Sequence, residues 1–155
     1  MPDFEPQTPD YAKRVEDSFA RQSIMDLIGA RLATVAPGHV EIELPYRADL
    51  TQQHDYLHAG VVTTIADSAG GYAAFSLMPG DASVLAVEFK VNLIAPAKGR
   101  LFRAIGRVKR PGRRLTVSEI EVLAVSDEGE KACLVGLHTS ICLPNTADLP
   151  PTSKA

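Results

Sequence analysis

The 155-residue chain has no tryptophan, only two cysteines and no long uncharged run of apolar residues. A membrane-spanning helix needs roughly 18 apolar residues in succession, and Asp67 interrupts the best candidate, residues 59–78. Cys133 and Cys142 would lie too far apart along one strand for a disulfide, and they form no CxxC pair of the kind that binds zinc. We therefore expect two reduced thiols, no metal site and no membrane span.

The chain also lacks a strong charge of either sign. Its 16 lysines and arginines oppose 19 acidic residues, for a net charge of −3, which provides no electrostatic basis for binding nucleic acid or an anionic membrane. The N-terminal segment lacks the basic and apolar regions of a signal peptide, and we expect a cytoplasmic protein. The length predicts one domain over residues 1–155, with an ordered core from about residue 10 to about 144 between two loose tails.

Hydrophobic periodicity predicts an α+β fold. A helix is expected over residues 10–29, where Gly29 can end it, and a longer, more apolar helix over Ala59–Met78, which Pro79-Gly80 would stop. A helix that is apolar nearly all round must be buried, and a curved antiparallel sheet around it would bury it. The expected strands, which alternate apolar and polar residues or lie between turn residues, are 30–38, 39–46, 83–95, 100–110, 113–126 and 131–143.

The third strand has the clearest alternation. Leu85, Val87, Phe89, Val91 and Leu93 are expected on one face and the residues between them on the other. The turns on either side of residues 113–126 contain glycines, at positions 112 and 129, which are expected to supply a permissive backbone.

Asp67 is unusual because it lies in the middle of the apolar helix. A bare carboxylate is expensive to bury, so Asp67 either bonds a neighbouring hydroxyl, such as Thr63 or Thr64, or has a function. Gly70 and Gly71 follow three and four positions later, and their small size would allow close approach by a ligand or by another backbone. Sequence periodicity alone leaves both readings open.

The start of the same helix is a second candidate feature. Its first N–H groups, near Gly60, have no partner within the helix and lie at the positive end of the helix dipole, where an oxyanion can bind. Gly60 and Asp67 differ by roughly 10 Å in height along the axis, whereas a reacting carbonyl must lie about 3 Å from both its nucleophile and its oxyanion donors. An acyl-transfer site would therefore need Gly60 of one subunit and Asp67 of another, at a dimer interface.

The segment “TQQHDYLHAGVVTTIADSAGGYAA”, followed by “VEFKVNLIAPAKG” and “RPGRRLTVSEIEV”, resembles the hotdog-fold acyl-CoA thioesterases of the phenylacetate-degradation (PaaI-like) type. The pattern of that family is Asn or Gln, five residues, His-Gly-Gly, and an acid nine positions after the His. Gln52, His58 and Asp67 have this spacing. The resemblance covers about residues 19–143 and implies a curved antiparallel sheet wrapped around one long helix, a homodimer, and often a tetramer of two dimers.

The resemblance implies hydrolysis of an acyl-CoA to free acid and CoA, with no cofactor. Asp67 would activate water or attack the thioester carbonyl. The N–H of Gly60 from the partner subunit would hold the thioester oxygen, Gln52 would position the water or the carbonyl, and His58 would orient the loop and the substrate. The remaining residues implied to contact the substrate or its CoA part are Ala59, Val61, Thr64, Val87, Glu88, Phe89, Gly112, Arg113 and Arg114.

Some of these assignments have a structural alternative. Arg113 and Arg114 in the “RPGRR” turn either bind CoA phosphates, for which guanidinium groups are well suited, or point into solvent. Tyr72, Ala73 and Phe75 either border an acyl tunnel or belong to the core. Aromatic and medium-chain acyl groups are both compatible with the sequence.

Three positions depart from the family pattern. Ala59 replaces the first glycine of His-Gly-Gly, and Asp55 stands where glycine is usual, although Asp tolerates a left-handed backbone better than most residues. Ala86 stands where a hydroxyl residue often faces the acid, so Ser68 or Ser83 would have to replace it.

Two other functions are compatible with the same fold. One is a non-catalytic, regulatory protein that binds acyl-CoA, and the other is a dehydratase acting on hydroxyacyl thioesters, whose catalytic pattern differs. The remaining histidines, His39, His54 and His138, are expected to be surface or core residues rather than catalytic ones.

Overall fold

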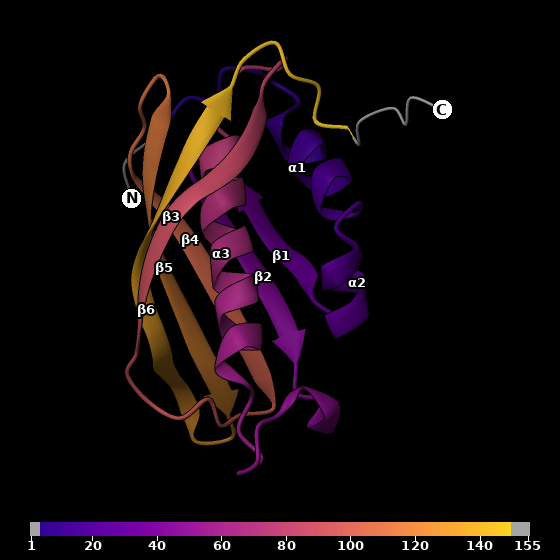
Figure 1. Cartoon of the computed structure of the whole chain (residues 1–155), viewed down its shortest axis with the longest axis vertical. Helices are drawn as coiled ribbons and strands as arrows, with labels where there is room; N and C mark the ends of the chain where they lie inside the picture. Colours follow the sequence, from indigo (N-terminus) through magenta and orange to yellow (C-terminus); the bar gives the residue numbers. More distant parts are fainter. Residues whose placement is uncertain (1–3, 150–155) are drawn as a thin grey trace.

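The computed structural model describes residues 4–149, in which a six-stranded antiparallel sheet curves around one long helix (Figure 1). The elements are α1 (Tyr11–Phe19), α2 (Ser23–Ile28), β1 (Arg31–Ala36), β2 (His39–Pro45), a short 3₁₀ helix (Ala48–Leu50), α3 (Ala59–Phe75), β3 (Ser83–Leu93), β4 (Leu101–Arg110), β5 (Leu115–Ser126) and β6 (Gly129–Leu143). The strands follow one another in the sheet as β1-β2-β4-β5-β6-β3. The predicted α+β hotdog architecture is confirmed.

Helix α3 is the centre of the core. Ile65, Ala66, Ala69 and Ala73 are fully buried, and the small side chains allow the sheet to approach closely. The closest approach is at Gly106 of β4, where a Cβ would lie 2.2 Å from the carbonyl oxygen of Ala69. Such contact requires glycine at that position, because no side chain can occupy the space.

The end of α3 differs from the prediction, since the helix stops at Phe75 rather than Met78. Ser76 follows the last helical residue, donates from Oγ to the carbonyl of Ala73 at 2.7 Å, and accepts from the N–H of Gly38 at 2.8 Å. The serine thus ties the helix end to the β1–β2 turn, a contact that no local pattern encodes.

The single N-terminal helix predicted over residues 10–29 is two helices in the structure. Arg21 and Gln22 lie in the break between them, although neither is a helix breaker. Arg21 forms an ion pair with Asp148 at 2.6 Å, and Gln22 accepts from Ser68 of α3 at 3.3 Å. Long-range contacts therefore accompany the break, while Gly29, with φ of 78°, ends α2 as predicted.

Strand β3 does not alternate as strictly as predicted, because a bulge separates Ala86 from Glu88. Ala86 pairs with Ser140 and Phe89 pairs with His138, both of which are buried on β6. Cross-strand partners share a face of the sheet, so Ala86 and Phe89 share the helix-facing side and Val87 is the extra residue of the bulge.

The described parts of both predicted tails make contacts with the fold. Phe4 lies against Gly38 and packs on the core, Gln7 donates from Nε2 to the carbonyl of Leu77 at 2.9 Å, and Asp148 binds Arg21. Residues 1–3 and 150–155 lie outside the described part of the chain.

Both cysteines are free, as predicted, and both are buried. Burial raises the pKa of the Cys133 thiol to about 11 and also raises the pKa of Cys142. Neither thiol is therefore suited to be a nucleophile near neutral pH.

Candidate active site

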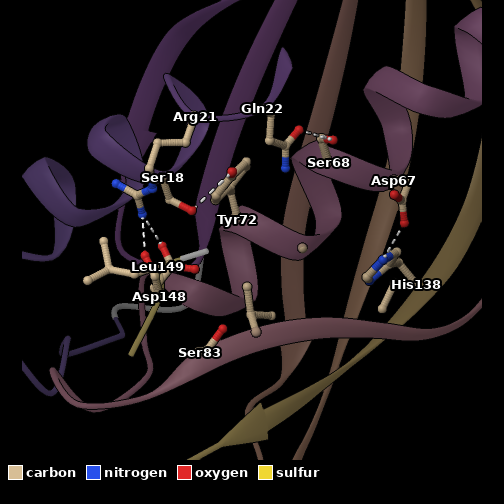
Figure 2. A pocket seen from close by; sticks show the side chains of 13 residues that line it. Ser18, Arg21, Gln22, Asp67, Ser68, Tyr72, Ser83, His138, Asp148 and Leu149 are labelled. Atoms are coloured by element: carbon tan, nitrogen blue, oxygen red, sulfur yellow. Dashed lines mark hydrogen bonds and ion pairs between the residues drawn. The ribbon is translucent and has the colours of Figure 1, made fainter. Parts of the chain in front are cut away.

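Asp67 opens into a cavity of about 310 Å³ between α3, the α1–α2 break and β3 (Figure 2). Its side chain is 35% exposed, so the carboxylate is neither buried nor fully solvated. The residues that line the cavity are Ser18, Arg21, Gln22, Asp67, Ser68, Gly71, Tyr72, Ser83, Val84, Ala86, His138, Asp148 and Leu149.

The partner of Asp67 is His138, a residue that was expected to have no part in the site. His138 Nε2 is hydrogen-bonded to Asp67 Oδ1 at 2.9 Å (Figure 2), and Ser140 Oγ is hydrogen-bonded to His138 Nδ1 at 3.2 Å. Thr63, Thr64, Ser68 and Ser83, the hydroxyl residues considered from the sequence, make no hydrogen bond to Asp67 in the described structure. Because His138 and Asp67 are 71 positions apart, only the pairing of β5, β6 and β3 beneath the helix brings them together.

The far end of the cavity is polar. Tyr72 donates from its hydroxyl to Ser18 Oγ at 3.2 Å, and burial raises the pKa of its phenol. The Arg21–Asp148 ion pair borders the same region (Figure 2). Tyr72 thus borders a cavity, whereas Ala73 and Phe75, which were considered with it, are core residues.

The start of α3 has a different environment. His58 is the N-cap, and its Nδ1 accepts from the N–H of Gly60 at 2.9 Å. The predicted oxyanion donor therefore already has an acceptor within the chain. The preceding N–H, that of Ala59, has no acceptor among residues 4–149, as expected of a first-turn amide.

Gln52 belongs to the loop before α3, and its side chain folds back on that loop. Its Oε1 accepts from the N–H of His54, and Asp55 in the same loop has a left-handed backbone with φ of 63°. Gln52 and Ala59 line a second cavity of about 460 Å³, bordered by Leu93 at the end of β3 and by Ile94. Within one chain, Gln52 and Asp67 thus face different cavities.

The other predicted substrate-contact residues on α3 and β3 are partly or fully exposed to solvent. Val61 and Thr64 are half-buried, and Thr64 donates from Oγ1 to the carbonyl of Gly60 at 2.8 Å. Val87, Glu88 and Phe89 are exposed on β3, which is an edge strand of the sheet.

The β4–β5 turn holds the predicted phosphate-binding residues away from the Asp67 cavity. Gly112 and Arg113 line a separate hollow near the end of α3, and Arg114 is exposed. Neither arginine has an ion-pair partner in the described structure. Gly112 is needed for close packing rather than for a left-handed backbone, because a Cβ there would lie 2.2 Å from the carbonyl oxygen of Leu115. Gly129 does have the expected positive φ, 121°.

Residues 54–131 match the model of the Thioesterase superfamily. The chain belongs to that superfamily. A crystal structure of a thioesterase family protein from Silicibacter pomeroyi is 51% identical, with a TM-score of 0.85, over 86% of this chain and 98% of that one. The 1,4-dihydroxy-2-naphthoyl-CoA hydrolase of Listeria monocytogenes is 27% identical over 75% of this chain and 92% of its own length.

The same fold occurs in the PaaI protein of the Escherichia coli phenylacetic acid degradation operon, with a TM-score of 0.79 and 17% identity over 90% of this chain and 98% of that one. The resemblance noted in the sequence is therefore confirmed, as is the predicted enzyme class, a thioester hydrolase. No helix within residues 4–149 of this superfamily member is both long and apolar enough to cross a membrane.

Proposed function

We propose that this protein hydrolyses acyl-CoA thioesters at a site completed by two subunits, with Asp67 as its acid. The observation that carries the proposal is the carboxylate of Asp67, which is held by His138 and still opens into a cavity. Thioester hydrolysis needs a base or nucleophile, oxyanion donors and water. A relative that is itself named as an acyl-CoA hydrolase supports the choice of substrate class.

In this proposal Asp67 uses its Oδ2 atom, since Oδ1 is bonded to His138. As a base, it takes a proton from water while the water oxygen attacks the thioester carbonyl, and collapse of the tetrahedral intermediate releases CoA. As a nucleophile, it forms an anhydride that water then cleaves. A single turnover in ¹⁸O-water distinguishes these routes, because only the nucleophilic route can leave label in the carboxylate.

The thioester oxygen is assigned to the N–H of Ala59 from the partner subunit. The N–H of Gly60 is bonded to His58, whereas the N–H of Ala59 has no acceptor within residues 4–149. The missing side chain of Gly60 leaves room for the carbonyl. Because His58 Nδ1 accepts a hydrogen bond, a neutral His58 has its proton on Nε2 and can donate it to the substrate.

The edge of β3 is proposed to join the two subunits. Leu85, Val87, Phe89 and Leu93 are each between 44% and 56% exposed, and a long apolar edge strand is a template for pairing with another chain. Antiparallel pairing of two β3 strands would satisfy their free backbone edges and would partly cover the apolar side chains beside them. It would also bring the start of one α3 towards the Asp67 cavity of the other subunit. Such an arrangement is needed because the start of α3 and Asp67 of the same helix are roughly 10 Å apart along its axis, too far for both to reach one carbonyl.

The CoA phosphates are assigned to Arg113 and Arg114. Ser118 pairs with His138 on β6, so Arg114 lies four residues, or about 13 Å, along β5 from the level of the acid. An extended pantetheine arm can cover such a distance. The lack of ion-pair partners among the described residues leaves both guanidinium groups available for phosphate.

Replacement of the acid tests the proposal. Asp67→Asn is expected to lower kcat for acyl-CoA hydrolysis at least about 100-fold, because a positioned base contributes about 10²- to 10⁴-fold. Thiol release from acetyl-, octanoyl- and benzoyl-CoA provides the measurement, with Asp127→Asn as the control because the side chain of Asp127 is 95% exposed. Full activity of Asp67→Asn would remove Asp67 from the mechanism. Binding of acyl-CoA by the native protein without thiol release would instead indicate a regulatory binding protein.

A further inference from the structure

Asp67 receives its orientation from a buried pair of residues on β6. We infer that His138, held by Ser140, is a positioning residue that directs the free oxygen of Asp67 towards the thioester. The inference rests on the proposed role of Asp67. Although His138 lies at the cavity wall, its side chain has 0% exposure, so we assign it to holding Asp67 rather than to contact with the substrate.

Both nitrogens of the His138 ring are hydrogen-bonded, and residues of β3 and α3 pack beside the ring. Nε2 bonds Asp67 and Nδ1 bonds Ser140. The ring of Phe89 on β3 is stacked on it, with a centroid distance of 6.4 Å and an angle of 6° between the planes. Gly70 lies against its Cβ and Cγ, at a distance that leaves no room for a side chain. A ring enclosed in this way has one orientation, and so does the carboxylate oxygen bonded to it.

The hydrogen bonds also indicate the tautomer of His138. An ionised carboxylate only accepts hydrogen bonds, so Nε2 must carry the proton. If the ring is neutral, Nδ1 is an acceptor, and the hydroxyl of Ser140, which is itself fully buried, must donate. This arrangement satisfies both ring nitrogens and the serine without burying a second charge.

The two carboxylate oxygens of Asp67 therefore have different roles. Oδ1 is fixed by the buried donor, and Oδ2 remains for the water or the carbonyl. Without His138, the side chain of Asp67 could rotate about χ1 and χ2 on the open face of α3. Misplacement of a reacting group by about 1 Å can cost up to about 100-fold in rate.

Substitution of His138 separates positioning from mere packing. His138→Leu, which fills the space but donates nothing, is expected to lower kcat about 10- to 100-fold with KM changed less than about twofold. His138→Gln, whose Nε2 amide can still donate to Asp67, should recover most of that loss. Ser140→Ala should have an intermediate kcat, because His138 then loses the group that selects its tautomer.

Two controls keep the result interpretable. Leu134→Val alters a fully buried residue on β6, four positions or about 13 Å from His138. It should leave kcat unchanged even though it lowers thermal stability to an extent similar to that of the His138 variants. Thermal unfolding of every variant identifies any that fail to fold. A folded His138→Leu with native kcat, or a His138→Gln no better than His138→Leu, overturns the inference.

The ring itself provides a measurement that does not depend on turnover. ¹⁵N NMR of the imidazole at neutral pH should show a protonated Nε2 and an unprotonated Nδ1, and Asp67→Ala should shift the Nε2 resonance. An Nδ1–H tautomer or an imidazolium overturns the assignment. If Asp67→Asn proves fully active while the NMR result holds, the proposed function fails and the hydrogen-bonded pair stands.

Discussion

Gly70 of α3 and His138 of β6 fit together because glycine has no side chain. A Cβ on Gly70 would lie 3.0 Å from both Cβ and Cγ of His138, and 2.7 Å from Cγ2 of Ile120. Real Cβ atoms essentially never come closer than 3.0 Å to another atom. The small residue next to the acid thus makes room for the partner of the acid rather than for the substrate.

Gly70→Ala is therefore expected to destabilise the fold by about 1–3 kcal/mol through overpacking, which exceeds the roughly 1 kcal/mol that alanine adds to a helix. It should also lower kcat, because the methyl group displaces the ring that holds Asp67. Urea unfolding and acyl-CoA turnover measure the two effects. Gly71→Ala is the matched control, since the nearest atom to its Cβ is 3.9 Å away, and it should be neutral or stabilising. Equal stabilities of the two variants would contradict the packing argument.

Ala59→Pro removes the N–H that is assigned to the thioester oxygen. Proline is favoured at the first position of a helix, and His58 already has the extended conformation that precedes proline, with φ of −61° and ψ of 137°. The variant should fold normally and lose about 10²- to 10³-fold in kcat, as expected for one oxyanion donor. Circular dichroism and turnover provide the readouts, with Ala59→Ser as the control. A folded Ala59→Pro with native kcat would rule out this donor.

The same variant shows whether two subunits share the site. Dimers assembled from Ala59→Pro and Asp67→Asn chains by refolding an equal mixture should recover about a quarter of the native activity, because half of the dimers then contain one intact site of two. Each variant refolded alone should stay inactive. Failure of the mixture to recover activity, with mixed dimers shown to be present by mass spectrometry, would place both groups of each site in one subunit. Native activity of either variant refolded alone would remove its substituted group from the site.

The thiol of Cys133 should be inert in the native protein. At pH 8, iodoacetamide is expected to label it only after denaturation, because it is 1% exposed and burial raises its pKa from 9.0 to about 11. The native state keeps this proton at a pH where the unfolded chain loses it. The resulting stabilisation is present below pH 9 and is lost as the pH rises from about 9 to about 11.

Comparison with Cys133→Ala isolates that contribution. Between pH 8 and pH 10.5, the free energy of unfolding of the native sequence should fall by on the order of 1–2 kcal/mol more than that of the variant. Urea titrations at the two pH values provide the comparison. Parallel decreases would show that the thiol has the same pKa in both states.

Much of the fold was predictable because its signals are local. The apolar residues of α3 and the alternating residues of the strands recur at the periods of the helix and the strand. The spacing of Gln52, His58 and Asp67 indicated the family. Asp55, which stands where the resemblance implies glycine, has the left-handed conformation that aspartate tolerates better than most residues.

Other features depended on contacts between distant segments. The break between α1 and α2 coincides with the bonds of Arg21 to Asp148 and of Gln22 to Ser68. The bulge at Val87 changed which side chains of β3 face the helix. Neither the helix break nor the bulge could be predicted from its own segment, since neither segment contains the glycine or proline that usually marks such an interruption.

The sequence by itself determined that one carboxylate, Asp67, interrupts the apolar helix and that the unpaired N–H groups lie near Gly60, since both follow from the order of residues along one helix. The tertiary structure alone decided what holds the acid. His138 reaches Asp67 because the antiparallel register of β6 places it beneath Gly70 and beside Phe89, and strand register is set by the packing of the whole sheet rather than by any short stretch of sequence.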